Sequence, residues 1–535
     1  MRCASRAGAL TAGARPVWQR RAWPRLWRIP RFGEPSRRPC GSSLRTIAKT
    51  EGRHDARCRT GQPRGRGTAR SGNSVTHAFH PSVLRAYDIR GIVGETLGPD
   101  DARALGRAFA HRVRAARESC RIVVGRDGRL TSPALEAALV EGLCEAGAAV
   151  IRVGVGPTPM VHFADHQLAA DGSVMVTGSH NPPSHNGFKL SLAGAPFYGE
   201  AIRLLAAAAL SPPAVTAGAA EEHQVIQTYA AGLADALAGQ GRPLRVAWDP
   251  GNGAAGAVLP ELTERLPGEH RILNGVVDGR FPAHHPDPSK PGNLAQLAEA
   301  VRAGGLDLGI AFDGDGDRLG VVDGSGQVVS SDHLLCVFAT DVLAAHPGAA
   351  ILADVKTSDT VFRRIRELGG HPKLGPTGHA HMRSRVLRGE ALFAGEMSGH
   401  LFFADEHPGY DDALYAAVRL LRALSRGPTL AERRVALPQT FSTPEIRIPY
   451  PDDRKFEVVR AVHDAVVRRG IVPSTLDGVR VSAAAGWWLL RASNTEAALV
   501  VRCEGYGEEE LARMCALVRG LLTEVGIEAA RIVAS

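Results

Sequence analysis

The sequence lacks two features that would place the protein in a membrane or in an oxidising compartment. No apolar run reaches the roughly 18 residues that a membrane-spanning helix needs. No C-x-x-C pair occurs, and the thiols beyond residue 75 are scattered along the chain: Cys120, Cys144, Cys336, Cys503 and Cys515. Scattered thiols in a chain of 535 residues are typical of reduced, mostly buried side chains. We therefore expect a soluble cytoplasmic protein without a membrane span.

Acidic residues are scarce in residues 1–75, where 17 arginines and one lysine face three acids. Little apolar periodicity and much Gly, Pro and Ser predict a disordered basic leader without a structural role, and a start site placed too early would explain it. The next methionine is Met160, so a later start would need another codon, with Val75 a candidate. Targeting is the alternative, although no apolar stretch suited to export follows Arg20-Arg21. N-terminal sequencing of the native protein would decide.

The positive charge of the chain is confined to this leader. The chain carries a formal net charge of +9 and the leader +15, which leaves −6 for residues 76–535. A nucleic-acid-binding protein is therefore disfavoured, because the leader shows no recognisable nucleic-acid fold. Deleting residues 1–75 separates the two hypotheses, since only a binding protein would lose its partner.

Short β-branched runs alternate with Ala/Leu/Glu stretches of helical period, which is typical of layered α/β domains. The pattern predicts strands at 121–125, 150–153, 172–176, 244–248, 306–312 and 351–355. It predicts helices at 132–146, 294–303 and 358–368, and an Ala-rich helix after Gly253. Three units end a strand in polar, Gly-rich residues, so ligand groups should gather at strand ends.

The chain from about residue 440 onward has a different pattern. Extended runs at 441–448 and 497–502 mix with helices at 455–468 and 508–522, which predicts a small α+β domain. Including it, we expect three similar mixed α/β domains plus a C-terminal α+β domain around a central active-site cleft. After the leader 1–75, the predicted domains are 76–222, 223–326, 327–438 and 439–535.

The stretch Thr177-Gly178-Ser179-His180-Asn181-Pro182-Pro183 holds a hydroxyl between a glycine and a histidine, ahead of two prolines that stiffen the loop. Because it follows the strand predicted at 172–176, Ser179 should lie beyond the carboxyl end of that strand. These features favour a nucleophile presented for chemistry over a loop cap.

Asp313-Gly314-Asp315-Gly316-Asp317-Arg318 places three carboxylates in one tight loop, which the intervening glycines allow. Such like charges repel unless a hard cation such as Mg²⁺ binds or one carboxylate is protonated. An EF-hand loop is excluded, because its sixth and twelfth positions should be Gly and Glu, where Arg318 and Gly324 stand. Mg²⁺ beside a reactive hydroxyl indicates phosphoryl transfer.

These two motifs, together with Gly395-Glu396-Met397-Ser398-Gly399-His400 and Arg491-Ala492-Ser493-Asn494-Thr495-Glu496, closely resemble the α-D-phosphohexomutase superfamily. Within it, the chain is most similar to the bacterial phosphomannomutase/phosphoglucomutase branch. The resemblance covers roughly residues 80–535 with its motifs in matching order. It implies reversible interconversion of hexose 6-phosphate and hexose 1-phosphate, of mannose and glucose, through phosphorylated Ser179 and a hexose 1,6-bisphosphate.

The resemblance also implies roles for single residues. The metal ligands would be Ser179, Asp313, Asp315 and Asp317, holding Mg²⁺. The catalytic group would comprise Ser179, Lys189, Arg90 and His379. The substrate-binding group would comprise Tyr87, Lys356, Glu396, Ser398, His400, Arg491, Ser493, Asn494 and Thr495.

Several of these positions have a plainer explanation. Arg90 is suited to bracing phosphate but could form a structural ion pair with Asp88. Lys189 could offset charge or, if its pKa is lowered, move a proton. His400 could only support the sugar loop, and a single histidine such as His379 is often structural.

The residues beside the nucleophile and the aspartates also leave alternatives open. His180 and Asn181 could position Ser179 or only stabilise its turn. Arg126-Asp127-Gly128-Arg129 matches a family segment but could equally be a strand-end turn with solvated charges. Arg318 could counter the aspartates, contact phosphate or form a structural ion pair.

Two positions depart from the family pattern. Relatives often carry a basic residue where this chain has Pro376, which puts a phosphate contact in doubt unless Lys373 compensates. Asp411-Asp412 is followed by Ala413, where a glycine is common, with an effect that should stay local.

Met397 and Asn494 favour the mannose/glucose branch, and phosphoglucosamine mutase is the alternative function. A non-catalytic sensor is disfavoured because Ser179 and all three aspartates are present. We expect hexose phosphates as the partners, no nucleic acid or membrane, and a monomer or weak dimer.

Overall fold

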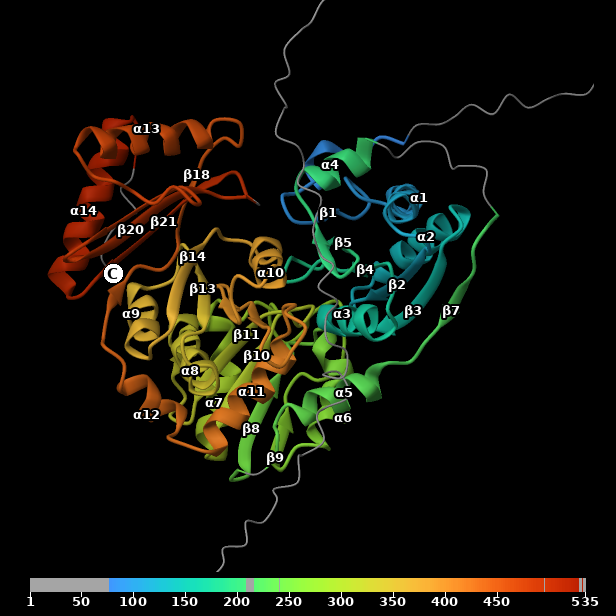
Figure 1. The fold of residues 1–535 in the computed structure, drawn as a ribbon, viewed down its shortest axis with the longest axis horizontal. Coiled ribbons are helices and arrows are strands. Elements are labelled where there is room, and N and C mark those ends of the chain that lie inside the picture. Colours follow the sequence, from blue (N-terminus) through green and yellow to red (C-terminus); the bar gives the residue numbers. More distant parts are fainter. Residues whose placement is uncertain (1–76, 208–215, 240, 495, 529–531, 533–535) are drawn as a thin grey trace, which may run out of the picture. The chain divides into compact units, whose positions relative to one another are not determined.

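The computed structural model describes residues 77–207, 216–239, 241–494, 496–528 and Ile532 (Figure 1). The predicted leader 1–75 and Thr495 lie outside the described residues. Within the described part of the chain, four separate β-sheets follow one another along the sequence, with helices between their strands. The predicted fold class is confirmed.

The first sheet contains seven strands in the described residues, in the order β1-β5-β4-β2-β3-β7, with β6 paired to β5. Its strands are β1 (Ile89–Ile92), β2 (Arg121–Arg126), β3 (Ala149–Val155), β4 (Gly172–Val176), β5 (His185–Leu192), β6 (Ala195–Phe197) and β7 (Ala220–Glu222). Its helices are α1 (Pro99–Ala116), α2 (Ser132–Glu145), α3 (Thr158–Gln167) and α4 (Glu200–Ala207), after a 3₁₀ turn at Pro81–Val83. The strands β2, β3 and β4 run parallel, so their carboxyl ends lie at one edge.

The second sheet has five strands within the described ranges, in the order β12-β11-β10-β8-β9. They are β8 (Leu244–Asp249), β9 (Gly268–Ile272), β10 (Leu308–Phe312), β11 (Leu319–Asp323) and β12 (Val328–Val329). Its helices are α5 (Ile226–Asp235), α6 (Leu259–Thr263) and α7 (Ala295–Gly304), with 3₁₀ turns at Ala254–Ala257 and Pro291–Leu294. The single Ala-rich helix predicted after Gly253 is wrong, because the chain forms a 3₁₀ turn before the short α6.

The third sheet, of four strands in the described chain, has the order β14-β13-β15-β16. Its strands are β13 (Ala350–Asp354), β14 (His371–Gly375), β15 (Phe393–Gly395) and β16 (Leu401–Phe403). Its helices are α8 (Ser331–Ala345), α9 (Asp359–Glu367), α10 (His379–Leu387), α11 (Ala413–Ser425) and α12 (Leu430–Val435).

The C-terminal sheet is built around the antiparallel strands β19, β20 and β21. The strands are β17 (Phe441–Ser442), β18 (Ile446–Pro449), β19 (Val479–Ala483), β20 (Gly486–Ala492) and β21 (Ala498–Gly505), and the helices are α13 (Lys455–Arg468) and α14 (Glu508–Glu524). The run predicted at 441–448 is two strands instead of one, because β17 and β18 pair with different parts of β21 around Pro444. Figure 1 shows α13 and α14 on one side of this sheet.

One hydrophobic core joins the first three sheets. It contains buried side chains of α3, α5, α8 and α11 together with strands of all three sheets. The C-terminal sheet has its own core, and Trp487 and Leu489 of β20 add a small cluster with Val355. This shared core fixes the strand ends of the three sheets relative to one another.

The turn after β8 is held by a buried carboxylate. Asp249 is fully buried and accepts hydrogen bonds from the Gly251 N–H at 2.9 Å and from Asn274 Nδ2 at 3.0 Å. His284 Nε2 lies 2.9 Å from the other carboxylate oxygen. This contact raises the pKa of His284 above its ordinary value.

Replacing His284 with Asn should therefore cost stability mainly at acidic pH. A raised folded-state pKa stabilises the protein below the unfolded pKa of about 6.5, and this contribution is lost as pH rises through the folded pKa. We expect the gap in denaturation midpoint between wild type and His284→Asn to be largest near pH 5.5 and to shrink by pH 9. A gap that grows with pH would contradict this assignment.

Candidate active site and metal centre

Two loops from different sheets meet at Ser179. One loop follows β4 of the first sheet and the other follows β10 of the second. The Ser179 side chain is buried, and its Oγ donates a hydrogen bond to Asp313 Oδ2 at 2.9 Å. A Cβ at Gly314 would lie 2.3 Å from the Ser179 carbonyl oxygen, so only glycine allows the loops to approach this closely.

The three aspartates form a buried carboxylate cluster. Asp313, Asp315 and Asp317 are fully buried, and their ligand atoms lie within 4.8 Å of one another. Burial and the charges of Asp317 and Asp315 raise the pKa of Asp313 well above its usual range. Asp315 Oδ1 is buried without a hydrogen-bond partner among the described residues. These oxygen donors fit a hard divalent cation, as the sequence predicts.

Lys189 lies against this cluster from β5. Its Nζ is 2.7 Å from Asp315 Oδ2 and also pairs with Asp317. Burial alone would lower the pKa of Lys189, but the neighbouring aspartates raise it. The side chain therefore stays charged, which favours the predicted charge-offsetting role over proton transfer.

Arg90 and His180 both contact the Ser179 loop. Arg90 forms the ion pair with Asp88 that the sequence left open, and its Nη1 donates to Asn181 Oδ1 at 2.9 Å. His180 Nδ1 lies 3.1 Å from Ser179 Oγ. Removal from water, with the charges of Arg318 and Arg90, holds the pKa of His180 well below its ordinary value. Because the Ser179 hydroxyl donates its one proton to Asp313, a neutral His180 with its proton on Nδ1 can donate to Ser179 Oγ.

The loop after β15 adds a carboxylate and an imidazole. Glu396 Oε1 accepts the Gly378 N–H at 2.6 Å, and Glu396 Oε2 lies 3.1 Å from His400 Nδ1. Ser398 Oγ is 2.9 Å from the same nitrogen, and His400 Nε2 is 3.3 Å from Asp317 Oδ1. Burial would lower the pKa of His400, but Asp317 and Glu396 raise it to about 9.

A charged His400 thus links the loop after β15 of the third sheet to the aspartate loop after β10 of the second. Arg318 strengthens this link, because it forms a backbone bridge with His400, and its own N–H donates to Asp313 Oδ1 at 3.2 Å. Asp317, His400 and Asp411 are also close enough to hold a metal, but a hard cation prefers oxygen ligands, of which the three aspartates supply more. The three-aspartate cluster is the better metal candidate.

Tyr87 brings the first, third and fourth sheets together. Its hydroxyl donates to the Thr377 carbonyl oxygen at 2.7 Å and accepts a hydrogen bond from Asn494 Nδ2. The His379 ring lies between Tyr87 and His400, with centroid distances of 5.8 and 5.3 Å. Removal from water and the charge of His400 lower the pKa of His379 to about 3, so its imidazole is neutral at pH 7.

Arg491 of β20 is a buried cation with an unused donor. Its Nε donates to Asp477 Oδ2 at 3.0 Å, and the Thr377 N–H donates to the same oxygen at 3.0 Å. Arg491 Nη2 is buried without a hydrogen-bond partner among the described residues. A buried guanidinium donor without an acceptor indicates a site for an anion such as phosphate. The neighbouring Ser493 is buried as well.

Lys356, directly after β13, completes the set of predicted residues that the structure describes. Its Nζ lies 3.6 Å from Glu445 Oε1 and 3.9 Å from Asp354 Oδ2. Lys373 Nζ, which the sequence suggests in place of the missing basic residue at Pro376, donates to the Glu390 carbonyl oxygen at 2.7 Å.

Sequence reasoning missed two residues of this region. Thr158, at the start of α3, donates its hydroxyl to Asp315, and Asp477 orients Arg491. Neither contact has a local sequence signal, since the partners are 157 and 14 residues apart.

Asp127 and Arg129 are buried, so a turn with solvated charges is wrong for these two residues.

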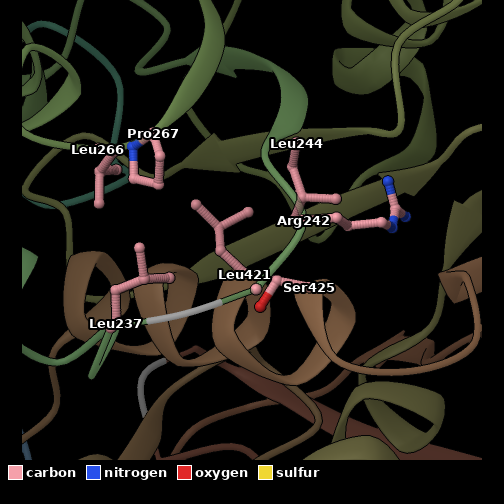
Figure 2. A pocket seen from close by; sticks show the side chains of 9 residues that line it. Leu237, Arg242, Leu244, Leu266, Pro267, Leu421 and Ser425 are labelled. Carbon is pink, nitrogen blue, oxygen red and sulfur yellow. The ribbon is translucent and has the colours of Figure 1, made fainter.

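A separate recess lies between α5, β8, β9 and α11 (Figure 2). Figure 2 shows its lining as mainly apolar, with Leu237, Leu244, Leu266, Pro267 and Leu421 beside Arg242 and Ser425. None of the predicted site residues lines it, so this recess is separate from the site around Ser179.

Replacing Asp315 with Asn should weaken divalent-cation binding about 10- to 100-fold, because a charged oxygen ligand is lost. Mn²⁺ binding measured by electron paramagnetic resonance checks this. Asp464→Asn on α13, whose side chain is 57% exposed, is the control and should bind Mn²⁺ like wild type. Equal affinity in Asp315→Asn and wild type would contradict a metal at this cluster.

Comparison with known proteins agrees with the predicted resemblance. Four family models, described as phosphoglucomutase/phosphomannomutase α/β/α domains I, II and III and the C-terminal domain, match residues 82–211, 227–326, 330–441 and 445–521. A phosphomannomutase/phosphoglucomutase from Pseudomonas aeruginosa is 43% identical over 447 residues, covering 83% of this chain and 96% of that protein. A phosphoglucomutase from Neisseria gonorrhoeae is 42% identical over 440 residues, covering 81% and 95%.

A solved structure gives the same result. The crystal structure of a phosphoglucomutase/phosphomannomutase family protein from Burkholderia thailandensis aligns with a TM-score of 0.78 at 38% identity, covering 85% of this chain and all of that one. Matching domain order, sequence identity over most of the chain and a common fold together confirm the family predicted from the motifs. The chain belongs to the phosphoglucomutase/phosphomannomutase family of phosphohexomutases.

Proposed function

We propose that this phosphohexomutase interconverts the 6-phosphates and 1-phosphates of mannose and glucose, with Ser179 as the phosphoryl carrier. The observation that carries the proposal is the contact of the Ser179 hydroxyl with the buried aspartate cluster, at 2.9 Å from Asp313. A hydroxyl is a weak nucleophile in water, so it needs such a neighbourhood to exchange a phosphoryl group. The names of the relatives from Pseudomonas and Neisseria support the reaction and the sugars.

The cycle begins with phosphorylated Ser179. The bond between Ser179 Oγ and phosphorus breaks, and a bond from phosphorus to a sugar hydroxyl oxygen forms. The sugar hydroxyl gives its proton to a base, and the leaving Ser179 Oγ takes up a proton. The resulting hexose 1,6-bisphosphate turns over in the site and returns its other phosphoryl group to Ser179. The net reaction moves no phosphate into or out of solution.

Asp313, Asp315, Asp317 and a phosphoserine oxygen of residue 179 would hold Mg²⁺, which neutralises charge on the transferring phosphoryl group. The unpartnered Asp315 Oδ1 and the raised pKa of Asp313 fit this ligand set. Lys189 adds a fixed positive charge beside the aspartates, and Arg90 braces the loop through Asn181.

The remaining residues bind and orient the sugar. Glu396, whose pKa is lowered to about 2 by its hydrogen bond to His400 against the effect of burial, offers an ionised carboxylate for two adjacent hydroxyls. His400 holds that carboxylate in place, and Ser398 contacts His400 in turn. His379 is neutral at pH 7 and can form hydrogen bonds with the sugar, but its lowered pKa of about 3 makes it a weak base.

The phosphate that does not react would bind at the C-terminal domain. Arg491, already oriented by Asp477, has a free donor for it, and Asn494 and Tyr87 lie beside it. Ser493, Thr495 and Lys356 complete this proposed phosphate site.

The location that we propose for this protein is the cytoplasm. The cysteines that the structure describes are all unpaired, which fits a reducing cytoplasm. No helix in the described ranges has the length and apolar character needed to cross a bilayer. We expect hexose phosphates as partners, with hexose 1,6-bisphosphate as activator, and a monomer or weak dimer.

Intact-mass analysis of freshly purified protein should show a single phosphate that maps to Ser179. Ser179→Ala should lose most turnover, because the phosphoryl carrier is gone, while Ser482→Ala on an exposed strand position should keep it. A coupled assay from mannose 1-phosphate checks this. Full activity in Ser179→Ala would contradict the mechanism.

Assays with mannose, glucose and glucosamine phosphates should give the highest rates with mannose and glucose. A dominant rate with glucosamine phosphate would instead identify a phosphoglucosamine mutase.

Glu396→Gln should lower kcat/KM about 10- to 100-fold, because a hydrogen bond to a charged group contributes about 1.5–3 kcal/mol.

A further inference from the structure

Arg129 lies at the centre of the loop that carries Ser179. Its side chain is fully buried, and its guanidinium donates to four backbone carbonyl oxygens of that loop. Nη2 donates to Ser179 at 2.7 Å and to Asn181 at 2.6 Å, and Nη1 donates to Pro182 at 2.6 Å and to His185 at 2.9 Å. One rigid cation thus gathers the carbonyl groups of the whole turn.

Asp127 completes the arrangement from the same strand end. Its Oδ2 accepts hydrogen bonds from Arg129 Nε at 3.1 Å, from Thr177 Oγ1 at 2.8 Å and from the Gly178 N–H at 3.2 Å. Thr177 Oγ1 in turn accepts the N–H of Ser179 at 2.8 Å. The backbone of the nucleophile is therefore fixed on both sides, its carbonyl by Arg129 and its N–H through Thr177 and Asp127.

The loop needs this support because Ser179 is strained. Its φ angle is +50°, a conformation that costs a non-glycine residue free energy unless its surroundings fix it. Gly178 fits beside the guanidinium only because it has no side chain, since a Cβ there would lie 2.6 Å from Arg129 Cζ. The ring of Phe281, which follows the second sheet's strand β9, covers the guanidinium. Arg129 Cζ lies 5.1 Å from the centroid of this ring.

We propose that Arg129, held by Asp127, is the positioning residue that aims Ser179 Oγ at the phosphoryl group. This inference rests on the proposed function. Arg129 contacts the carbonyl group of Ser179 and not its hydroxyl, so it acts through the loop. Lysine cannot replace it, because one ammonium has three donors on a flexible chain and cannot reach four separated carbonyl oxygens in the plane of a guanidinium.

The test compares two fully buried arginines. Arg129→Lys is measured against Arg419→Lys, because Arg419 is equally buried but pairs with Asp341 and Asp405, which do not belong to the Ser179 loop. The rate of Ser179 phosphorylation by glucose 1,6-bisphosphate is followed by quenched intact-mass analysis. Arg129→Lys should lower it about 100-fold, the effect of misplacing a reacting atom by about 1 Å, without raising KM. Arg419→Lys should leave it unchanged.

A second pair of measurements separates positioning from general stability. Hydrogen exchange in Arg129→Lys should rise in the peptides that cover 177–186, whereas Arg419→Lys should leave those peptides protected. Added guanidinium ions should restore part of the phosphorylation rate of Arg129→Ala. If Arg129→Ala does not fold, Arg129→Lys decides.

Equal phosphorylation rates in Arg129→Lys and wild type would overturn the inference, and so would equal losses in Arg129→Lys and Arg419→Lys. Failure of the proposed function looks different. In that case the wild-type protein itself would take up no phosphoryl group at Ser179.

Discussion

The structure of the site depends on one close approach, between the loop after β4 and the loop after β10. The carbonyl group of Ser179 lies against Gly314 while the side chain of Ser179 bonds to Asp313. These loops belong to different sheets, so their contact is only as precise as the packing between the sheets. The shared core of the first three sheets provides that precision, because side chains of α3, α5 and α11 fill the space between them.

The contact between these two loops brings several charged side chains together in a buried space. Their arrangement determines the protonation state of each group. Three buried aspartates would repel strongly, and Lys189 and a protonated His400 offset that repulsion. Removal from water, together with nearby positive charges, lowers the pKa of His180 and of His379 and keeps both neutral. Three histidines within one site thus differ in charge because their neighbours differ. The loop after β15 and the loop after β10 share His400, which contacts Glu396 of the one and Asp317 of the other.

The C-terminal domain is joined to this centre by its own buried cations. Arg502 of β21 donates to the Lys356 carbonyl oxygen and pairs with Asp332 at 2.9 Å, and the Trp487 ring lies beside its guanidinium at 5.5 Å. Arg491, on the neighbouring strand, meets Asp477 and so faces Thr377 of the third sheet. A phosphate held by Arg491 would therefore be placed relative to the sugar loop by contacts within the protein.

The sequence by itself determined the α/β alternation, the order of the motifs and their place at strand ends, because hydrophobic period and Gly-rich turns are local properties. It also predicted site roles for Ser179 and the three aspartates. The structure brings these side chains together, while their roles and the domain boundaries stay predictions. Only the tertiary structure decided that Arg129 clamps the nucleophile loop, that Asp477 orients Arg491 and that His400 is charged. The reason is physical: burial and partner choice arise when distant segments meet, and the pKa of a group depends on those neighbours.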